Sequence, residues 1–339
     1  MKKFINTAET VAAETLEGYL AVHRNEFIAL PGVLGFAKRH PQDKVAIVSG
    51  GGSGHEPVWL EYAGPGFADA IVQGDVFAAP PPPAIVTVAK AVDRGHGVLF
   101  LYGNYTGDAL NFDLAAEQLE ADGHRVRTVR VNDDVAAAPP ERAKDRRGIA
   151  GGFFTSKIAG AAADAGLDLD AVHAAAATAN ARTRSIGVAS GAGTIPGKNE
   201  PTFTLPDGAM EIGLGMHGEP GVRRGGMLAA DAAVDQMLEL VRQDLSVQPR
   251  DSVCVLVNGL GATTRAELFI AARRVIQLLD NDDVEIHKFL VGNFATSQEM
   301  HGFSISLLKL NEAMQSWFDW PGHTSFYASH PAAAQAVTG

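Results

Sequence analysis

Short apolar runs alternate with alanine-rich segments along the first half of the chain. Residues 45–48 and 98–102 are almost wholly apolar, and glycine follows each run within a few positions. Residues 126–131 mix apolar and basic positions in rough alternation, whereas residues 84–94 and 109–123 have the composition of helices. Strand, turn, helix and strand at this spacing predict an α/β sheet with crossover helices.

The pattern changes near residue 183, after two consecutive helices predicted at residues 151–165 and 169–181. A second series then begins, with strands expected at 185–189, 210–216, 253–257, 285–291 and 303–308 and helices at 228–243 and 264–279. We therefore predict an α/β fold of two domains, each a mixed or parallel sheet flanked by helices. Their expected extents are residues 1–183 and 184–339.

Composition limits the location and the partners. The 339 residues are 46% apolar and 20% charged and carry a net charge of −11, so clustered Lys and Arg for nucleic acid are not expected. No run approaches the roughly 18 apolar residues of a membrane span. The N-terminal segment is amphipathic and acidic, unlike a signal peptide. The single cysteine, Cys254, lies in an apolar run and is expected to be a buried strand residue. These features favour a cytoplasmic protein that binds neither nucleic acid nor membrane.

The first candidate segment is residues 50–57, GGGSGHEP, directly after a predicted strand. Its glycines allow the backbone to approach a ligand closely. It lacks the closing Gly-Lys-Ser/Thr of a phosphate loop and the acidic residue of the dinucleotide fingerprint. A tight strand-to-helix turn is therefore the alternative interpretation, but His55 at the end of the segment favours a functional one.

Two more segments carry candidate side chains: residues 104–108, NYTGD, and residues 213–221, GLGMHGEPG. Asp108 follows a strand end, where α/β proteins place ligands, and could act as a general base. On spacing alone, an N-cap of the helix at 109–123 is the favoured role for Asp108. His217 lies among glycines, which suits an accessible nucleophile or acid–base group, although a plain surface histidine fits too. No metal-ligand set occurs at a recognised spacing, so no metal site is expected.

Together, the three segments resemble the substrate-binding subunit of the dihydroxyacetone kinases. The likeness continues at residues 146–151, 157–160, 202–203, 258–263 and 302–309, in order along nearly the whole chain. The resemblance implies that His217 bonds covalently to the ketone carbon of the substrate and forms a hemiaminal. It also implies that Asp108 takes the proton of the terminal hydroxyl and that His55 assists through hydrogen bonds. The implied substrate contacts are Gly52, Ser53, Gly103 and Asn104.

The sequence departs from the family at Gly103, where a lysine usually precedes NYTGD. The absence of this lysine removes a charge and several methylene groups, which opens space beside residues 104–108. Residues 75–81, DVFAAPP, also carry Ala and Pro where the family has hydroxyl side chains. Both changes favour a larger short ketose, such as the four-carbon erythrulose, over dihydroxyacetone.

The resemblance implies a phosphotransferase that works with a second protein. The sequence contains no Walker motif and no acidic magnesium cluster, so no cofactor is expected on this chain. Mg-ATP, or ADP rephosphorylated by a sugar phosphotransferase system, is expected on a helical nucleotide-binding subunit. A homodimer is implied as well.

Two alternatives remain open. One is a non-catalytic ketose-binding paralogue that acts as a transcriptional co-regulator. Asp108 beside His217 favours the enzyme, because a sensor has no need of a base. The other alternative, a metal-dependent hydrolase or aldolase, is disfavoured because no metal-ligand set is visible.

Overall fold

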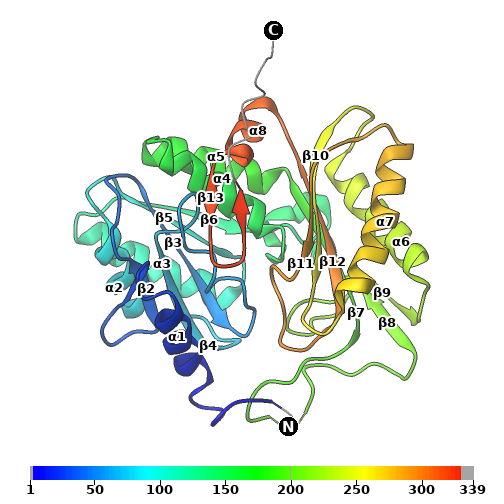
Figure 1. The fold of residues 1–339 in the computed structure, drawn as a ribbon, viewed down its shortest axis with the longest axis horizontal. Helices are drawn as coiled ribbons and strands as arrows, with labels where there is room; N and C mark the ends of the chain where they lie inside the picture. Colours follow the sequence, from blue (N-terminus) through cyan, green and yellow to red (C-terminus); the bar gives the residue numbers. More distant parts are fainter. Residues whose placement is uncertain (1–2, 199, 330–339) are drawn as a thin grey trace.

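The computed structural model describes residues 3–198 and 200–329, which form two six-stranded sheets (Figure 1). In the first sheet the strand order is β1-β2-β4-β3-β5-β6. Its strands are β1 (Phe27–Ala29), β2 (Gly35–Lys38), β3 (Ala46–Ser53), β4 (Ala70–Val76), β5 (Val98–Gly103) and β6 (Val126–Val131). Strands β4, β3, β5 and β6 are parallel, and β1 and β2 add an antiparallel edge.

The second sheet has the order β11-β10-β12-β7-β8-β9. Its strands are β7 (Thr183–Gly191), β8 (Ala209–Ile212), β9 (Arg223–Gly226), β10 (Ser252–Gly259), β11 (Glu285–Gly292) and β12 (His301–Lys309). Only β10 and β11 pair in parallel. A short hairpin of β13 (Gly322–His323) and β14 (Ala328–Ser329) follows.

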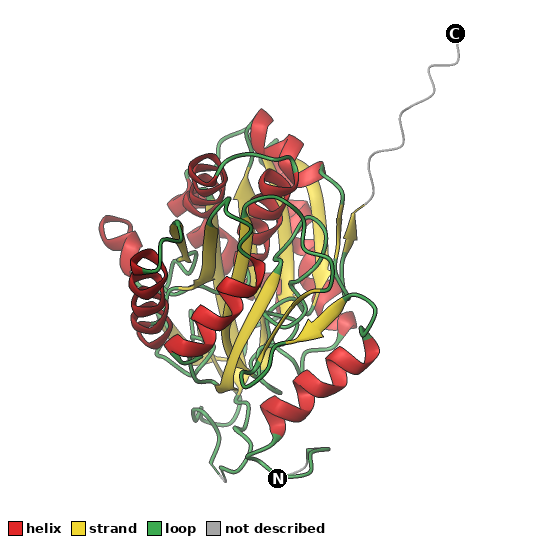
Figure 2. Cartoon of the chain, turned by 90° about the vertical axis from the view of Figure 1, so that its left-hand side faces the viewer, coloured by secondary structure: helices red, strands yellow, loops and turns green. Residues whose placement is uncertain are grey.

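The helices form three layers around the two sheets. They are α1 (Val11–Val22), α2 (Pro82–Val92), α3 (Thr106–Ala121), the 3₁₀ helix η1 (Pro140–Asp145), α4 (Gly152–Asp164), α5 (Leu169–Ala181), α6 (Ala230–Leu245), α7 (Arg265–Asn281) and α8 (Glu312–Asp319). Helices α2 and α3 cover the outer face of the first sheet, and Figure 2 shows helices in front of its strands. Helices α6 and α7 cover the outer face of the second sheet. Helices α4 and α5 lie between the sheets.

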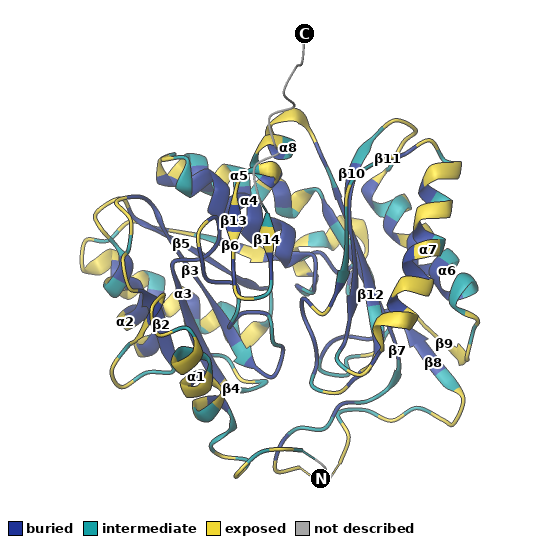
Figure 3. Ribbon diagram, viewed as in Figure 1, coloured by how far each residue is buried: buried dark blue, intermediate teal, exposed yellow. Residues whose placement is uncertain are grey.

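The central layer forms one continuous core with both sheets. Leu99 and Val131 of the first sheet, Phe153 of α4, and Leu256 and Leu308 of the second sheet belong to the same buried cluster. Figure 3 shows helix α4 and most strands of both sheets coloured as buried. Moving the two sheets apart would expose the apolar side chains of this cluster to water, at roughly 25 cal/mol per Å² of exposed apolar surface. The shared core therefore holds the two sheets in a fixed arrangement.

The predicted α/β class is confirmed, and the predicted strands and helices occur close to their expected positions. Cys254 is fully buried in β10, as predicted. The strand expected at 210–216 ends at Ile212, and the glycine-rich residues beyond it form a loop. The tight strand-to-helix turn considered for residues 50–57 is wrong, because Gly50–Ser53 continue β3 and the next element is β4.

The division into residues 1–183 and 184–339 stays a proposal. The second sheet does begin at Thr183, but α8 returns to pack on α4. The buried Lys157 Nζ donates hydrogen bonds to the carbonyl oxygens of Trp317 at 3.1 Å and Trp320 at 2.7 Å. Across residues 3–198 and 200–329, no helix has the length and apolar content needed to cross a membrane.

Close packing of α4 gives a stability prediction. A methyl group on Gly160 would overlap the backbone of Gly66 and Phe67, which cannot move as a side-chain tip can. Gly160→Ala should therefore destabilise the fold by about 1–3 kcal/mol. Gly18, exposed in α1 with open space around it, is the matched control. Gly18→Ala should stabilise by about 0.4–1 kcal/mol. Urea unfolding of both variants measures the difference, and equal effects would contradict this packing.

Candidate active site

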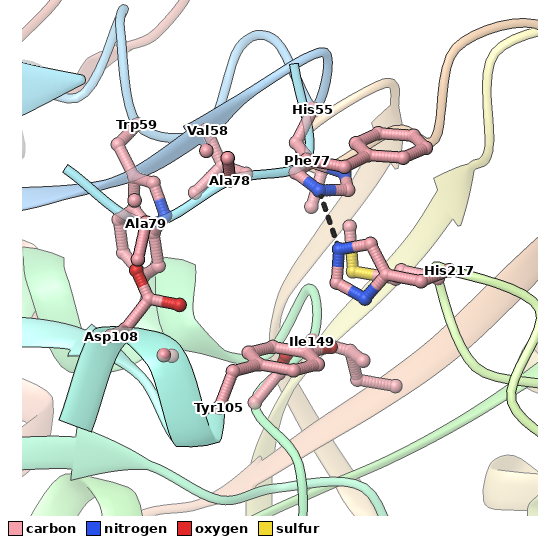
Figure 4. Close-up of a pocket in the computed structure, with 17 residues that line it drawn as sticks. His55, Val58, Trp59, Phe77, Ala78, Ala79, Tyr105, Asp108, Ile149 and His217 are labelled. Carbon is pink, nitrogen blue, oxygen red and sulfur yellow. Dashed lines mark hydrogen bonds between the residues drawn. The ribbon is translucent and has the colours of Figure 1, made fainter. Parts of the chain in front are cut away.

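A cavity of about 230 Å³ lies at the carboxyl ends of the parallel strands of the first sheet (Figure 4). Its other wall comes from loops of the second sheet, residues 213–222 after β8 and residues 293–300 after β11. The lining residues are Gly51, Gly52, His55, Val58, Trp59, Phe77, Ala78, Ala79, Gly103, Tyr105, Gly107, Asp108, Gly148, Ile149, Met216, His217 and Ala295. The chain passes from β3 to β4 on one side and later to β5 on the other side of β3. Parallel sheets usually bind ligands at such a reversal of strand order, at the carboxyl ends of the strands.

His55 connects the two walls of the cavity. Its Nδ1 lies 2.7 Å from the carbonyl oxygen of Thr296, which can only accept, so Nδ1 carries the hydrogen. Burial, together with the charge of His217, lowers the pKa of His55 to about 3. His55 is therefore neutral at physiological pH, and its Nε2 is an acceptor. Phe77 stacks on the ring at 4.5 Å between centroids and has a backbone φ of 59°, in the strained left-handed region.

His217 comes from the opposite wall of the cavity and contacts His55, with 3.0 Å between the two Nε2 atoms (Figure 4). Since His55 Nε2 accepts, His217 Nε2 donates to it. On the other side of the ring, Nδ1 lies 3.2 Å from Glu219 Oε1. The His217 ring also meets the edges of Tyr105 and Phe77, at 4.9 and 5.1 Å between centroids. These contacts fix the orientation of the imidazole.

Glu219 is a site residue that the sequence analysis missed. Burial alone would raise its pKa, but the hydrogen bond and charge of His217, its own backbone N–H and Arg147 lower the pKa to about 2. The carboxylate is thus ionised and stabilises positive charge on the His217 ring. The signal was available in the sequence, because Glu219 lies two residues after His217 in HGEPG. The backbone N–H of His217 also donates to Glu219, at 2.9 Å.

Asp108 lies in the first turn of α3 and points into the cavity (Figure 4). The N-cap role is wrong, because Tyr105 is the N-cap residue and Asp108 is the third residue of the helix. Burial raises the pKa of Asp108 to about 6, although its own backbone N–H and His217 act in the opposite direction. Its Oδ1 is buried without a hydrogen-bond partner among the described residues. Such an acceptor suits a group that takes a proton from a bound hydroxyl.

The other expected contacts divide into two groups. Gly52 and Gly103 line the cavity, whereas Ser53 and Asn104 lie outside its lining. Ser53 Oγ donates to the carbonyl oxygen of Gly74 at 2.7 Å. Asn104 Nδ2 donates to carbonyl oxygens of Lys144 and Arg146. These two side chains hold the loops, and their contact with substrate stays a prediction.

The space expected at Gly103 is lined by aromatic rings. A methyl group on Gly103 would meet the Tyr105 ring at 3.2 Å and the Trp59 ring at 3.6 Å. Trp59, which the sequence analysis missed, comes from the segment after the glycine-rich strand end. Over residues 3–198 and 200–329, no group of three or more His, Cys, Asp or Glu is arranged to hold a metal ion.

Residues 17–326 match the family model described as the Dak1 domain. The chain belongs to this family. The dihydroxyacetone-binding subunit of a PTS-dependent dihydroxyacetone kinase 2 from Listeria innocua is 41% identical, over 96% of this chain and 99% of that protein. A D-erythrulose kinase from Mycolicibacterium smegmatis is 39% identical, and this Dak1 chain spans only 58% of that protein's length.

Solved structures of the same family superpose closely. Dihydroxyacetone kinase from C. freundii, in complex with AMP-PNP and Mg²⁺, gives a TM-score of 0.89 at 31% identity, covering 98% of this chain and 62% of that chain. The dihydroxyacetone kinase operon co-activator Dha-DhaQ gives 0.88 at 27% identity, covering 94% and 98%. The resemblance to kinase substrate-binding subunits is therefore confirmed. So is the phosphotransferase family, because the relatives are kinases of short ketoses.

The raised pKa of Asp108 predicts a pH-dependent stability difference. Since the folded-state pKa exceeds the ordinary 3.8, the native state holds this proton more tightly, and stability falls as pH rises from about 4 through about 6. Asp108→Asn removes that loss, by at most about 3 kcal/mol from roughly two pKa units. The variant should melt above wild type at pH 8, with a smaller difference at pH 4. Exposed Asp207→Asn should show no such trend; equal Tm differences at both pH values would contradict the assignment.

Proposed function

We propose that this chain is the substrate-binding catalytic subunit of a dihydroxyacetone-type kinase. It holds dihydroxyacetone or a related short ketose, such as erythrulose, as a hemiaminal on His217, and a terminal hydroxyl is phosphorylated. The observation that carries the proposal is the single cavity shared by His217, His55 and Asp108. A nucleophile, a proton carrier and a base thus face one space, as the reaction requires.

Hemiaminal formation follows from the hydrogen bonds around His217. Attack on the ketone needs a lone pair on Nε2, so the proton that Nε2 donates to His55 must leave. His55 Nε2, at 3.0 Å, is positioned to carry it to the former carbonyl oxygen. The N–C bond forms as the C=O π bond breaks, and the oxygen becomes a hydroxyl. Nδ1 faces the ionised Glu219 carboxylate, which can only accept, so the ring starts with a hydrogen on each nitrogen. It exchanges the Nε2 hydrogen for the bond to carbon, and the carboxylate stabilises its positive charge before and after the step.

Covalent attachment explains the chemical selectivity of such a site. Only a ketone or aldehyde can form the bond, so polyols without a carbonyl are not anchored. Once the carbon is fixed to the His217 ring, the terminal hydroxyl keeps little freedom. This loss of motion before the reaction is the entropic contribution to catalysis.

Asp108 then acts as the general base. With a pKa of about 6 it is ionised at neutral pH, yet basic enough to take a proton from the hydroxyl as that oxygen attacks phosphorus. The phosphoryl group brings negative charge, and phosphoryl transfer relies on Lys, Arg or metal cations to stabilise it. The described lining residues include neither Lys nor Arg. This supports a partner subunit that brings Mg-ATP, or ADP with a phosphoryl donor chain, together with its own cations.

The cavity is large enough for more than dihydroxyacetone. Its volume of about 230 Å³ exceeds the ~150 Å³ that holds benzene, which has as many non-hydrogen atoms as dihydroxyacetone. Relatives act on both dihydroxyacetone and erythrulose, as their names state. Both ketoses are therefore proposed substrates.

A transcriptional co-regulator is the second candidate, because the co-activator Dha-DhaQ shares the fold. The fold alone does not separate the two functions. The buried, unpartnered Oδ1 of Asp108 favours the kinase, since binding a ketone on His217 requires no such base.

The covalent step predicts a mass increase located at His217. Wild-type protein incubated with dihydroxyacetone should gain the mass of one ketose when it is weighed intact under non-denaturing conditions, and His217→Ala should gain none. The control is His96→Ala, an exposed histidine paired with Asp43, which should behave like wild type. An unchanged adduct in His217→Ala would refute the hemiaminal.

Asp108→Asn separates binding from transfer. Asn keeps the shape, and the hemiaminal forms without the base, so ketose binding should persist. Phosphoryl transfer with a nucleotide-binding subunit present should fall about 10²–10⁴-fold. Stopped assays of ketose phosphate formation measure the rate. Parallel losses of binding and rate would instead make Asp108 a positioning group.

A further inference from the structure

Trp59 fills the space between the ends of two parallel strands. It is 9% exposed and lines the cavity. A methyl group on Gly51, in β3, would overlap the indole nitrogen, and one on Gly103, at the end of β5, would touch the far side of the ring at 3.6 Å. Glycine at position 51 is therefore needed to hold the indole here, whereas position 103 only borders the ring.

The indole nitrogen of Trp59 and the unpartnered Oδ1 of Asp108 both lie close to the position that a Cβ on Gly51 would take. The Cβ position of Gly51 that overlaps Trp59 Nε1 lies only 3.5 Å from Asp108 Oδ1. Figure 4 shows the Trp59 ring next to the Asp108 carboxylate, at the end of the cavity away from His217. Oδ1 is buried without a partner, and Trp59 Nε1 donates no hydrogen bond to any residue in 3–198 or 200–329. A donor and a buried acceptor thus lie unpaired at one end of the cavity.

We propose that Trp59 Nε1–H and the Asp108 carboxylate together bind the terminal hydroxyl of the ketose that is to be phosphorylated. This inference rests on the proposed function of the site. A hydroxyl has one hydrogen to donate and two lone pairs to accept. The indole N–H, a donor only, bonds to one lone pair, and the carboxylate, an acceptor only, takes the hydrogen. The second lone pair of the oxygen is left facing the cavity, where the phosphorus must arrive.

Indole suits this role better than an ammonium group would. A lysine beside Asp108 would lower the pKa of the carboxylate through its charge, and would make it a weaker base. The neutral ring of Trp59 instead excludes water from Asp108, in keeping with the burial that raises the pKa to about 6. Trp59 therefore supplies a donor for the hydroxyl without weakening its base. The replacement of the family lysine by Gly103 is part of the same arrangement.

The test uses Trp59→Phe, which keeps an aromatic ring and removes the N–H. The measurement is the concentration of dihydroxyacetone that gives half-maximal adduct on the full chain, by intact mass under non-denaturing conditions. Trp59→Phe should raise this concentration by about tenfold, the typical worth of one hydrogen bond. Acetone, which has the ketone but no hydroxyl, should form its adduct equally well on both proteins. Trp317→Phe, in α8 away from the cavity, is the matched control and should match wild type.

A double-mutant cycle with Asp108→Ala tests whether both groups act on one hydroxyl. Trp59→Phe should add little once Asp108 is alanine, because the oriented hydroxyl is already lost. Additive effects, an unchanged dihydroxyacetone affinity in Trp59→Phe, or an equal loss for acetone would each overturn the inference while leaving the hemiaminal in place. A wild-type protein that forms no adduct would overturn the proposed function, and this inference with it.

Discussion

The hydrogen bond from His55 Nδ1 to the carbonyl oxygen of Thr296 is the constraint on which the site depends. It joins the glycine-rich strand end of the first sheet to the loop before β12 of the second. Backbone bonds reinforce it, from Thr296 N to the His55 carbonyl and from Gln298 N to the Gly54 carbonyl, both 3.0 Å. The carbonyl fixes the His55 tautomer, and that tautomer makes Nε2 of His217 a donor. One backbone oxygen therefore sets the role of the two facing Nε2 atoms.

Burial gives the three ionisable groups of the cavity different tasks. Burial and the charge of His217 lower the pKa of His55 to about 3, which keeps this ring neutral, as its proposed role of proton carrier requires. Burial raises the pKa of Asp108 to about 6, which makes a stronger base. Glu219 keeps its charge because His217 and Arg147 outweigh burial and lower its pKa to about 2. Separated pKa values in one cavity are the usual mark of divided acid–base roles.

The sequence predicted the elements whose patterns are local, and it missed those that depend on tertiary contacts. Apolar runs predicted β3, β5 and β10, and the family resemblance carried by three motifs implied His55, Asp108 and His217 as one site. Strand β4, with a Gln and a Gly inside it, lacks a clear period and was not predicted. Trp59 was missed because its position depends on contacts with Gly51 and Gly103. Neither glycine has a side chain that would signal the contact, and Gly103 is distant in sequence. The N-cap interpretation of Asp108 was wrong because α3 begins at Thr106, three residues before the predicted start at residue 109.

The proposed chemistry at His217 converts the ketone carbon of the substrate to a tetrahedral carbon bonded to the ring. Carbon NMR tests this chemistry most directly. The protein carries ¹⁵N in its histidine side chains, and the added dihydroxyacetone carries ¹³C at the carbonyl carbon. Hemiaminal formation predicts that the carbonyl signal of bound ketose disappears and that a signal of a saturated carbon appears, coupled to one ring nitrogen of His217. A bound ketose that keeps its carbonyl signal and shows no coupling to nitrogen would contradict it.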